Sequence, residues 1–475
     1  MKPIPLFGDG VKSYSEAVTA QRRLNVFFDV RTDGDKEKIV VRGTPGTVLW
    51  ITLPVFPIRA WRVVKGVMYA LAGANLYSVT SAGVVTTLGS ITNGSSLCSM
   101  SDNGLQVILV DGIAGYIYAI GGAFTTIVDA NFPAGASTVG FLNGRFYVES
   151  PNTLRFYLSG SYDGTLWTPV AFASKENNPD NIVAVDVLNG MLILYGGDTT
   201  EFWQDNGVAN VPVQRIGGTT QTWGLAAKFS RANLNNTQAF LGKNPQGSVQ
   251  VLMLDGYKPV RISTSDIENI INGFSTFSDA VALTYMIDGH PMYQLTFPTG
   301  GRSFLFDAVT HMWFEVQTGL GLMARHYGNL GIVFGAVNYM ADYSSGNIYQ
   351  ISGTVYTDNL QPIKRQVVSR HVSNGGNRFS IDKIFLDMET GVGLQSGQGS
   401  TPMISMEVSK DKGRTFSAPL SVSLGAVGQY ESPRPIWRRI GAAIDFVFRF
   451  TVTDPVKFVI TSGSAKTRSQ EGSDG

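Results

Sequence analysis

The sequence predicts an all-β protein whose long middle part forms a six- or seven-bladed β-propeller. Charged residues make up only 15% of the 475 residues, whereas glycine (54 residues) and aromatic side chains (11%) are abundant. Glycine relieves strain in tight turns, and aromatic side chains suit the pleated surface of a sheet. Short alternating strands joined by Asn-Gly and Asp-Gly turns recur along the chain. Together these features favour strands over helices.

The repeat begins with a meander of three short strands over 67–71, 76–79 and 84–88. Comparable hairpin units follow between residues 106 and 351. Seven units in this part of the chain average about 41 residues each, near the period of four-stranded propeller blades. The number of blades stays open between six and seven, because neighbouring hairpins can share a blade. A pair of irregular β-sandwiches is the alternative architecture.

The turns of these units carry the strongest local signal. Asn143-Gly144 and Asn189-Gly190 stand between two apolar runs, and Asp111-Gly112 and Asp255-Gly256 do the same. A two-residue hairpin loop needs positive φ angles, which these residue types tolerate. One helix is expected among the strands, from Ser265 to Gly273, with a capping-box pattern at its start.

The spacing of the strands changes near both ends of the chain. We expect an extended arm over 1–46, the propeller over 47–360, an antiparallel β-sandwich-like domain over 361–461 and a flexible tail over 462–475. The third of these is indicated by longer alternating stretches than those of the propeller. Those stretches are 383–388, 403–408, 446–452 and 457–460.

Charge and cysteine content exclude several classes of protein. The net charge of +1 gives no whole-chain attraction to nucleic acid or to a membrane surface. The single cysteine, Cys98, excludes an internal disulfide framework. The most apolar late stretch, 440–450, is too short for a transmembrane span. The first residues lack the apolar run of a secretory signal, so we expect synthesis in the cytosol.

The sequence predicts neither a catalytic centre nor a metal site, and no cofactor. Its four histidines are scattered, and motifs for zinc, phosphate or a serine nucleophile are missing. The histidines are His290, His311, His326 and His371.

One turn motif points towards sugar chemistry. The segment 409–416 resembles the Asp-box of sialidase-type propellers, with phenylalanine in place of the usual tryptophan. Its residues Ser409, Asp411, Gly413, Thr415 and Phe416 are interpreted as a structural turn, in which the carboxylate accepts backbone N–H groups and the ring packs beneath. A carbohydrate-active (sialidase-like) or glycan-binding propeller is the alternative function, and a generic scaffold for protein partners is a third.

Several short segments in a fixed order carry a resemblance to a known family. They are Arg23-Leu24-Asn25 with 42–46, 66–69 with Leu76-Tyr77, 195–202, 265–271 and Trp437-Arg438-Arg439-Ile440-Gly441. Their order and separation resemble those of the packaged-DNA stabilisation proteins of short-tailed bacteriophages, the tail accessory factors also called tail hub or nozzle. Residues 391–398 and those after 462 find no match in that pattern.

The resemblance implies a structural protein of the virion tail that is made in the host cytoplasm. It implies a homo-oligomeric ring of six copies below the portal and its adaptor ring. Such a ring would continue the DNA channel, retain packaged DNA with weak non-specific contact to the duplex, and support the tail needle, fibres or spikes during ejection.

Two small groups are the predicted assembly interface. One is Arg22, Arg23 and Asn25 in the arm, and the other is Trp437, Arg438 and Arg439. An exposed tryptophan beside two arginines is common at protein interfaces. We therefore expect both groups to contact the adaptor or a neighbouring subunit.

Overall fold

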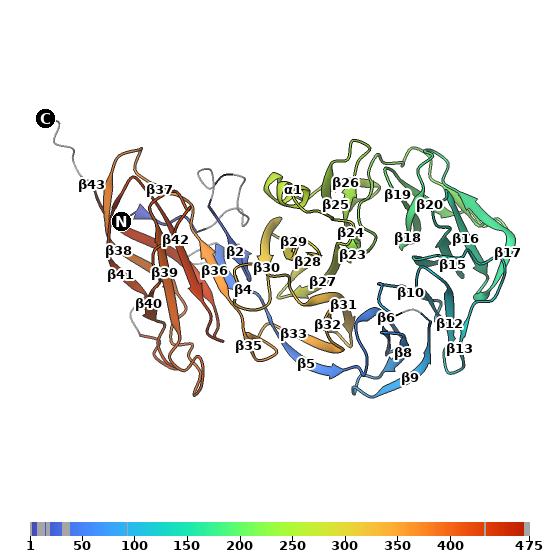
Figure 1. Cartoon of the computed structure of the whole chain (residues 1–475), viewed down its shortest axis with the longest axis horizontal. Coiled ribbons are helices and arrows are strands. Elements are labelled where there is room, and N and C mark those ends of the chain that lie inside the picture. Colours follow the sequence, from blue (N-terminus) through green and yellow to red (C-terminus); the bar gives the residue numbers. More distant parts are fainter. Residues whose placement is uncertain are drawn as a thin grey trace.

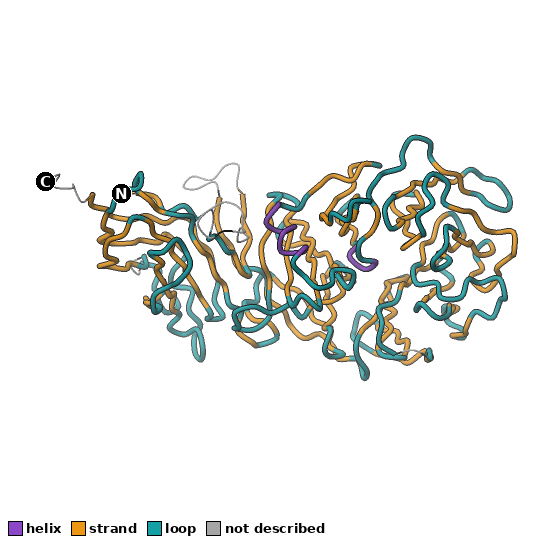
Figure 2. Tube along the Cα trace, turned by 45° about the horizontal axis from the view of Figure 1, so that its top comes forward, coloured by secondary structure: helices purple, strands orange, loops and turns teal. Residues whose placement is uncertain are grey.

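A computed structural model describes residues 2–6, 15, 20–30, 39–92, 94–431 and 434–469. The chain folds into a propeller and a sandwich that lie side by side (Figure 1). Strands and their turns make up almost all of both parts (Figure 2). Among the described residues the only α-helix is α1, Ser265–Asn272, which lies between two blades.

Seven four-stranded antiparallel blades form the propeller in the described part of the chain. Blades one to three are β6 (Ile58–Val64), β7 (Val67–Ala72), β8 (Asn75–Val79) and β9 (Val85–Ser90); β10 (Ser99–Asp102), β11 (Gln106–Val110), β12 (Gly115–Ala119) and β13 (Phe124–Thr126); and β14 (Val139–Leu142), β15 (Arg145–Glu149), β16 (Arg155–Gly160) and β17 (Asp163–Ser174). Blade four is β18 (Ile182–Leu188), β19 (Met191–Gly196), β20 (Thr200–Asp205) and β21 (Val213–Arg215).

The remaining blades include two departures from a simple meander. Blade five has a broken inner strand, β22 (Gly224–Leu225) and β23 (Ala232–Leu234), followed by β24 (Thr237–Lys243), β25 (Val249–Asp255) and β26 (Lys258–Arg261). Blade six is β27 (Val281–Ile287), β28 (His290–Phe297), β29 (Arg302–Asp307) and β30 (Met312–Val316). Blade seven is β31 (Gly328–Phe334), β32 (Val337–Asp342) and β33 (Asn347–Ser352), completed by β5 (Gly46–Thr52) from the start of the chain.

Local turn chemistry explains why these hairpins form. Asn143 and Gly144 have φ angles of 45° and 85°, and Asn189 and Gly190 have φ angles of 50° and 75°. These are the positive values that a two-residue turn requires. Each predicted hairpin unit lies within one blade, and the choice between six and seven blades is resolved as seven.

The ring closes between blades one and seven. The indole N–H of Trp61 in β6 donates to the carbonyl oxygen of Gly331 in β31 at 3.2 Å. Buried side chains of both blades form one hydrophobic cluster that includes Ile58, Met68, Phe334 and Ala341. Strand β5 also holds blades one and seven together at this seam, because it precedes blade one in the chain and pairs with β33 of blade seven.

The helix forms where the sequence predicts it, with a shifted cap. Its N-cap is Thr264, whose hydroxyl accepts from the backbone N–H of Ile267, and its C-cap is Gly273. The expected capping box starting at Ser265 is wrong in detail. Glu268 accepts instead from the hydroxyl of Ser263 at 2.7 Å.

Two sheets build the sandwich. One contains β36 (Arg365–Val368), β42 (Asp445–Val452), β39 (Met403–Ser409) and β40 (Leu420–Ser423), with β37 (Val372–Ser373) also paired to β42. The other contains β3 (Val26–Val30), β4 (Ile39–Gly43), β43 (Val459–Ser469), β38 (Phe379–Met388) and β41 (Ile436–Ala443), with β1 (Lys2–Pro3) also paired to β43. A short hairpin, β34 (Thr357–Asp358) and β35 (Gln361–Pro362), follows the propeller.

Both chain ends differ from their predicted forms. The expected extended arm is wrong for 26–30 and 39–43, which form a hairpin in the second sheet of the sandwich. The expected flexible tail is wrong for 462–469, which belong to the central strand β43. Apolar residues such as Phe28 and Val41 are fully buried there, which stabilises this pairing. Residues 470–475 lie outside the described part.

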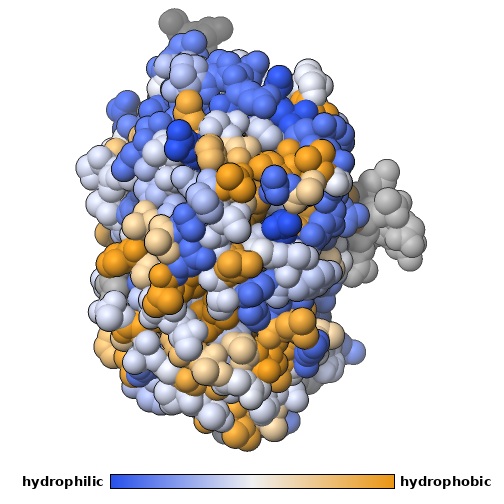
Figure 3. Space-filling model, turned by 90° about the vertical axis from the view of Figure 1, so that its right-hand side faces the viewer, coloured by the Kyte–Doolittle hydropathy of each residue, from blue (hydrophilic) through white to orange (hydrophobic). Residues whose placement is uncertain are grey.

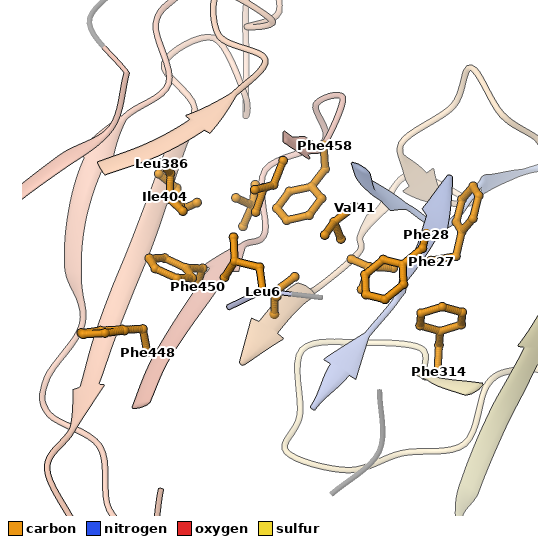
Figure 4. Packing of buried hydrophobic residues seen from close by; sticks show 14 of the residues in the cluster. Leu6, Phe27, Phe28, Val41, Phe314, Leu386, Ile404, Phe448, Phe450 and Phe458 are labelled. Atoms are coloured by element: carbon orange, nitrogen blue, oxygen red, sulfur yellow. The ribbon is translucent and has the colours of Figure 1, made fainter. Parts of the chain in front are cut away.

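The propeller and the sandwich share one core and one sheet. The two-residue strand β2 (Arg23–Leu24) pairs in parallel with β30 of blade six and antiparallel with β36 of the sandwich. This joins them into a 10-stranded sheet. Figure 4 shows Phe28 of β3 beside Phe314 of blade six, and their ring centroids lie 5.4 Å apart. The two parts are therefore packed as one body.

Candidate assembly interface

The joint strap, residues 22–25, lies between the propeller and the sandwich. Asn25 has a φ of 53° and a side chain that is only 2% exposed. Its amide nitrogen donates to the carbonyl oxygens of Gln317 (3.1 Å) and Lys364 (3.0 Å), and its amide oxygen accepts from the backbone N–H of Gln317 at 2.9 Å. Asn25 thus ties the end of blade six to the start of the sandwich.

Arg23 is fully buried beside it. Its guanidinium donates to the carbonyl oxygen of Leu6 at 2.6 Å and lies 4.8 Å from the ring centroid of Phe28. Arg23 and Asn25 were expected to contact another protein. The structure instead buries both side chains inside this chain, where another subunit does not reach them. The physical reason is that buried backbone groups of the joint need polar partners, which these two side chains supply.

Arg22 is the strap residue that reaches the surface, with a side chain 19% exposed. It forms an ion pair with Glu315 at 2.9 Å and donates to the carbonyl oxygen of Leu322 at 3.2 Å. Arg302 pairs with the other oxygen of Glu315 at 2.7 Å. Arg22 and Arg302 therefore share one carboxylate, and the charges of these three residues sum to +1.

An apolar loop next to Arg22 was not predicted from the sequence. Leu320, Leu322 and Met323 are 50%, 79% and 66% exposed, although they are large apolar side chains. Backbone carbonyls of this loop accept from Arg22, Gln317 and Lys364, so the loop is held without its own side chains. Contiguous exposed apolar residues of this kind mark interaction surfaces. The signal in the sequence was the run Leu320-Gly-Leu-Met, in which apolar and polar residues do not alternate as they do in a half-buried strand.

The second predicted group lies on β41, an outer strand of the sandwich. Trp437 was expected to be exposed, but it is 3% exposed and packs in the core, with its ring centroid 5.6 Å from that of Phe450. Its indole N–H donates to the carbonyl oxygen of Leu420 at 2.7 Å. Strand alternation explains the correction, since it turns Trp437 inward and Arg438 outward.

Arg438 and Arg439 are both exposed. The pairing of β41 with β38 shifts register at this point, and Arg439 has a φ of 61°. Such a bulge turns two successive side chains to the same side of the sheet. The structure therefore separates the predicted interface into a buried tryptophan and two exposed cations.

The Asp-box turn has a self-contained hydrogen-bond network. The carboxylate of Asp411 accepts from the backbone N–H of Thr415 at 2.9 Å, from its hydroxyl at 2.6 Å and from the hydroxyl of Ser409 at 2.7 Å. These donors hold the pKa of Asp411 well below its usual range, the hydroxyl of Thr415 contributing most. Gly413 has a φ of 89°, and the ring of Phe416 lies 3.9 Å from the guanidinium carbon of Arg449. The residues are thus engaged in the turn itself.

A groove of about 520 Å³ separates this turn from β41. Its lining combines cations with apolar side chains. The lining residues are Val408, Lys410, Asp411, Thr415, Phe416, Ser417, Leu420, Arg439 and Ile440. A second groove, of about 500 Å³, lies between the propeller and the sandwich and carries matched charges such as Arg42 with Asp29 at 3.2 Å.

A polar network connects blades three and five within the propeller. The carboxylate of Glu149 in blade three accepts from the backbone N–H of Ser137 at 2.8 Å and from the hydroxyl of Thr138 at 2.6 Å. Lys228 of blade five donates to the hydroxyl of Ser137, and its ammonium lies 3.9 Å from Glu149. Burial lowers the pKa of Lys228. This network cross-links the blades rather than presenting a reactive group.

Another buried polar cluster lies at the joint between the propeller and the sandwich. Burial raises the pKa of Asp358 to about 7, against the opposing effect of Arg365. Burial also lowers the pKa of His326 to about 4, with the charge of Arg325 acting in the same direction. The cavity beside these residues has a volume of about 10 Å³, which is room for one water at most.

The end of the propeller farthest from the sandwich carries scattered hydrophobic patches (Figure 3). Its long outer strand β17 exposes Leu166 and Val170 at 50% and 60%, and Val128 after β13 is 91% exposed. Within the described ranges, no group of three or more histidine, cysteine or carboxylate side chains could hold a metal ion. No helix there is long and apolar enough to cross a membrane.

Comparison with known proteins identifies two matching family models. Residues 5–356 match the model described as bacteriophage P22 Gp10, beta-propeller, and residues 364–468 match the model described as bacteriophage P22 Gp10, beta-sandwich. No curated protein matches the sequence.

Several solved structures match this chain at low identity. A chain of the mitotic checkpoint complex is 11% identical, with a TM-score of 0.41, and the match covers 68% of this chain and 96% of that one. The WD40 propeller domain of Doa1 is 11% identical with a TM-score of 0.40, covering 65% and 97%. Virginiamycin B lyase from Staphylococcus aureus is 9% identical with a TM-score of 0.39, covering 69% and 98%.

Proposed function

Since this chain belongs to the family of the bacteriophage P22 Gp10 protein, a family of structural phage proteins and not of enzymes, we propose that it forms the hub or nozzle ring of a short virion tail. In this proposal six copies surround the axis below the portal and its adaptor ring. The ring continues the DNA channel, retains packaged DNA, and supports the needle, fibres or spikes during ejection.

The observation that carries this proposal is the continuity between propeller and sandwich. One 10-stranded sheet runs from blade six through β2 into the sandwich, and one hydrophobic cluster spans both parts. Packed cores resist deformation. A subunit built this way holds its shape under the load of packaged DNA, whereas two domains on a loose linker would bend.

The charge balance also fits a conduit. The chain carries 37 lysines and arginines against 36 aspartates and glutamates. Each phosphate that a protein neutralises strengthens DNA binding through counterion release. A wall along which DNA slides therefore benefits from few net positive charges.

For contacts to neighbouring subunits and the adaptor we propose the predicted residues that reach the surface, together with the apolar loop of Leu320, Leu322 and Met323. Those residues are Arg22, which is partly exposed, and Arg438 and Arg439, which are exposed. Large apolar side chains that stay exposed next to one another mark interaction surfaces, and methionine is enriched at protein interfaces. Arginine is also enriched at interface cores.

The test is the mass of the purified chain, alone and mixed with adaptor rings. We expect a ring of six copies, or a complex on the adaptor, and ring symmetry in low-resolution images. Leu322→Ser should shift the chain to monomers without altering its thermal unfolding, and Val309→Ser serves as a control, since Val309 is 51% exposed on the turn between β29 and β30. A chain that stays monomeric and ignores the adaptor contradicts the proposal.

A glycan-directed propeller is the second function that the Asp-box suggested. Asp411, Ser409 and Thr415 satisfy one another, so they support a structural turn and not a sugar site. Turnover of a host-surface glycan that a single carboxylate substitution abolishes would favour this alternative.

A further inference from the structure

The groove beside the Asp-box turn is bounded by two strand edges. In the described residues β40 pairs only with β39, and β41 pairs only with β38, so each has one unpaired edge. The hydrogen bond from Trp437 to the carbonyl oxygen of Leu420 holds these strands, one from each sheet, next to each other. A volume of about 520 Å³ lies within the range of roughly 300–1,000 Å³ typical of ligand sites.

The rim of the groove is cationic. Lys410 and Arg439 line it, and Lys412, Arg414 and Arg438 extend the same turn and strand as exposed side chains. Lys410 reaches across to β41, because a Cβ atom added to Gly441 would meet its ammonium nitrogen at 2.8 Å.

One carboxylate, that of Asp411, lines the groove as well. Both of its oxygens already accept hydrogen bonds from Thr415, and one of them also from Ser409. A ligand therefore meets an excess of positive charge.

The floor of the groove distinguishes between two anionic partners. Phe416, Leu420 and Ile440 line it, and Leu420 is 50% exposed. A DNA backbone offers phosphates and sugars, which gain little from an apolar floor. An extended peptide with alternating acidic and apolar side chains would place carboxylates on the rim and apolar groups on the floor, and its backbone could pair with a free strand edge.

We propose that this groove binds an extended segment of a partner protein in which acidic and aliphatic residues alternate. The inference rests on the proposed function only for the location of that partner in the tail. The groove itself, with its two free edges, its cationic rim and its apolar floor, is a property of this chain.

The experiment measures binding of the full-length chain to a fluorescent 12-residue peptide of alternating glutamate and leucine, by fluorescence anisotropy. Lys410→Gln with Arg439→Gln should weaken binding about tenfold or more, as expected when two charged contacts are lost. Leu420→Ser should weaken it about threefold to tenfold, because only a half-exposed side chain is removed. Lys65→Gln with Lys258→Gln is the matched control, since it removes two exposed charges from the propeller and should leave binding unchanged.

Three results would overturn the inference. They are failure of the unaltered chain to bind the peptide, equal binding by the groove variant and the control, and tighter binding of a short DNA duplex that depends on Lys410 and Arg439 but not on Leu420. Ring formation by the groove variant is measured in parallel. A variant that forms rings but does not bind the peptide separates the groove from the ring-forming role. An unaltered chain that binds the peptide but assembles neither alone nor on the adaptor refutes only that role.

Discussion

Replacing Asn25 with glycine should loosen the joint between propeller and sandwich. Glycine tolerates the φ of 53°, so this variant removes the side chain without straining the backbone. It deletes the hydrogen bonds to the carbonyls of Gln317 and Lys364 and the one from the N–H of Gln317. Buried backbone groups on both sides of the joint are left without those partners.

The magnitude follows from these bonds. Each is worth about 1 kcal/mol net, so Asn25→Gly should lower the free energy of unfolding by about 3 kcal/mol. For 475 residues that unfold together, at about 2.1 cal/mol/K of unfolding entropy per residue, that corresponds to a fall in melting temperature of about 3 °C. Asn25→Ala should cost about 1–2 kcal/mol more, because alanine is strained at a positive φ.

Differential scanning calorimetry is the assay, and Asn235 is the control. Asn235 has a φ of 56° but is exposed, so Asn235→Ala measures the backbone strain alone. We also expect the single transition of the unaltered chain to split in Asn25→Gly, because propeller and sandwich become less coupled. If Asn25→Gly melts within about 1 °C of the unaltered chain, which corresponds to a loss of only about 1 kcal/mol for a chain of this length, the strap is not the coupling element.

Three further predictions concern pH and packing. The lowered pKa of Asp411 means that its stabilising effect is present above its ordinary pKa near 4 and is lost at lower pH. Asp411→Asn should therefore reduce the fall in melting temperature between pH 5 and pH 3. An equal fall in the variant and the unaltered chain would contradict the hydrogen-bond network of the turn. His326 is neutral in the folded chain with a pKa of about 4, so the stability that it confers is complete above pH 6.5 and decreases towards pH 4, by about 3 kcal/mol at most. His326→Asn should flatten urea-unfolding stability over that window, and an unchanged pH profile would show that the ring is not kept neutral. Gly346→Ala should destabilise the seam by about 1–3 kcal/mol in the same denaturant titration, because its Cβ would lie 2.2 Å from the carbonyl oxygen of Leu53. Gly197→Ala is the control and should be neutral, because the space at its Cβ is open.

The blades could be predicted because residues close together in the sequence specify each hairpin. Turns such as Asn143-Gly144 and the apolar alternation beside them specify each hairpin within a dozen residues. The seam could not be predicted in the same way. The outer strand of blade seven, β5, lies about 300 residues from its partner β33 along the chain, and no local pattern reports such a pairing.

The interface residues were harder to predict for a similar reason. The contrast between Trp437 and Arg438 depends on which face of β41 meets the core, and on a bulge that turns Arg439 outward as well. Arg23 and Asn25 carry polar side chains that are common on surfaces, yet the joint buries them to satisfy backbone groups. The Asp-box was more predictable, because its donors and acceptor lie within seven residues.

The use of β5 to complete blade seven has a consequence for synthesis. The ribosome synthesises β5 about 300 residues before β33, which corresponds to roughly 15–60 s of translation. During that interval the ring is open and the edges that will meet at the seam are unpaired. Any chaperone that covers these edges on the nascent chain would act in this interval, and truncated chains ending before residue 347 would keep them exposed.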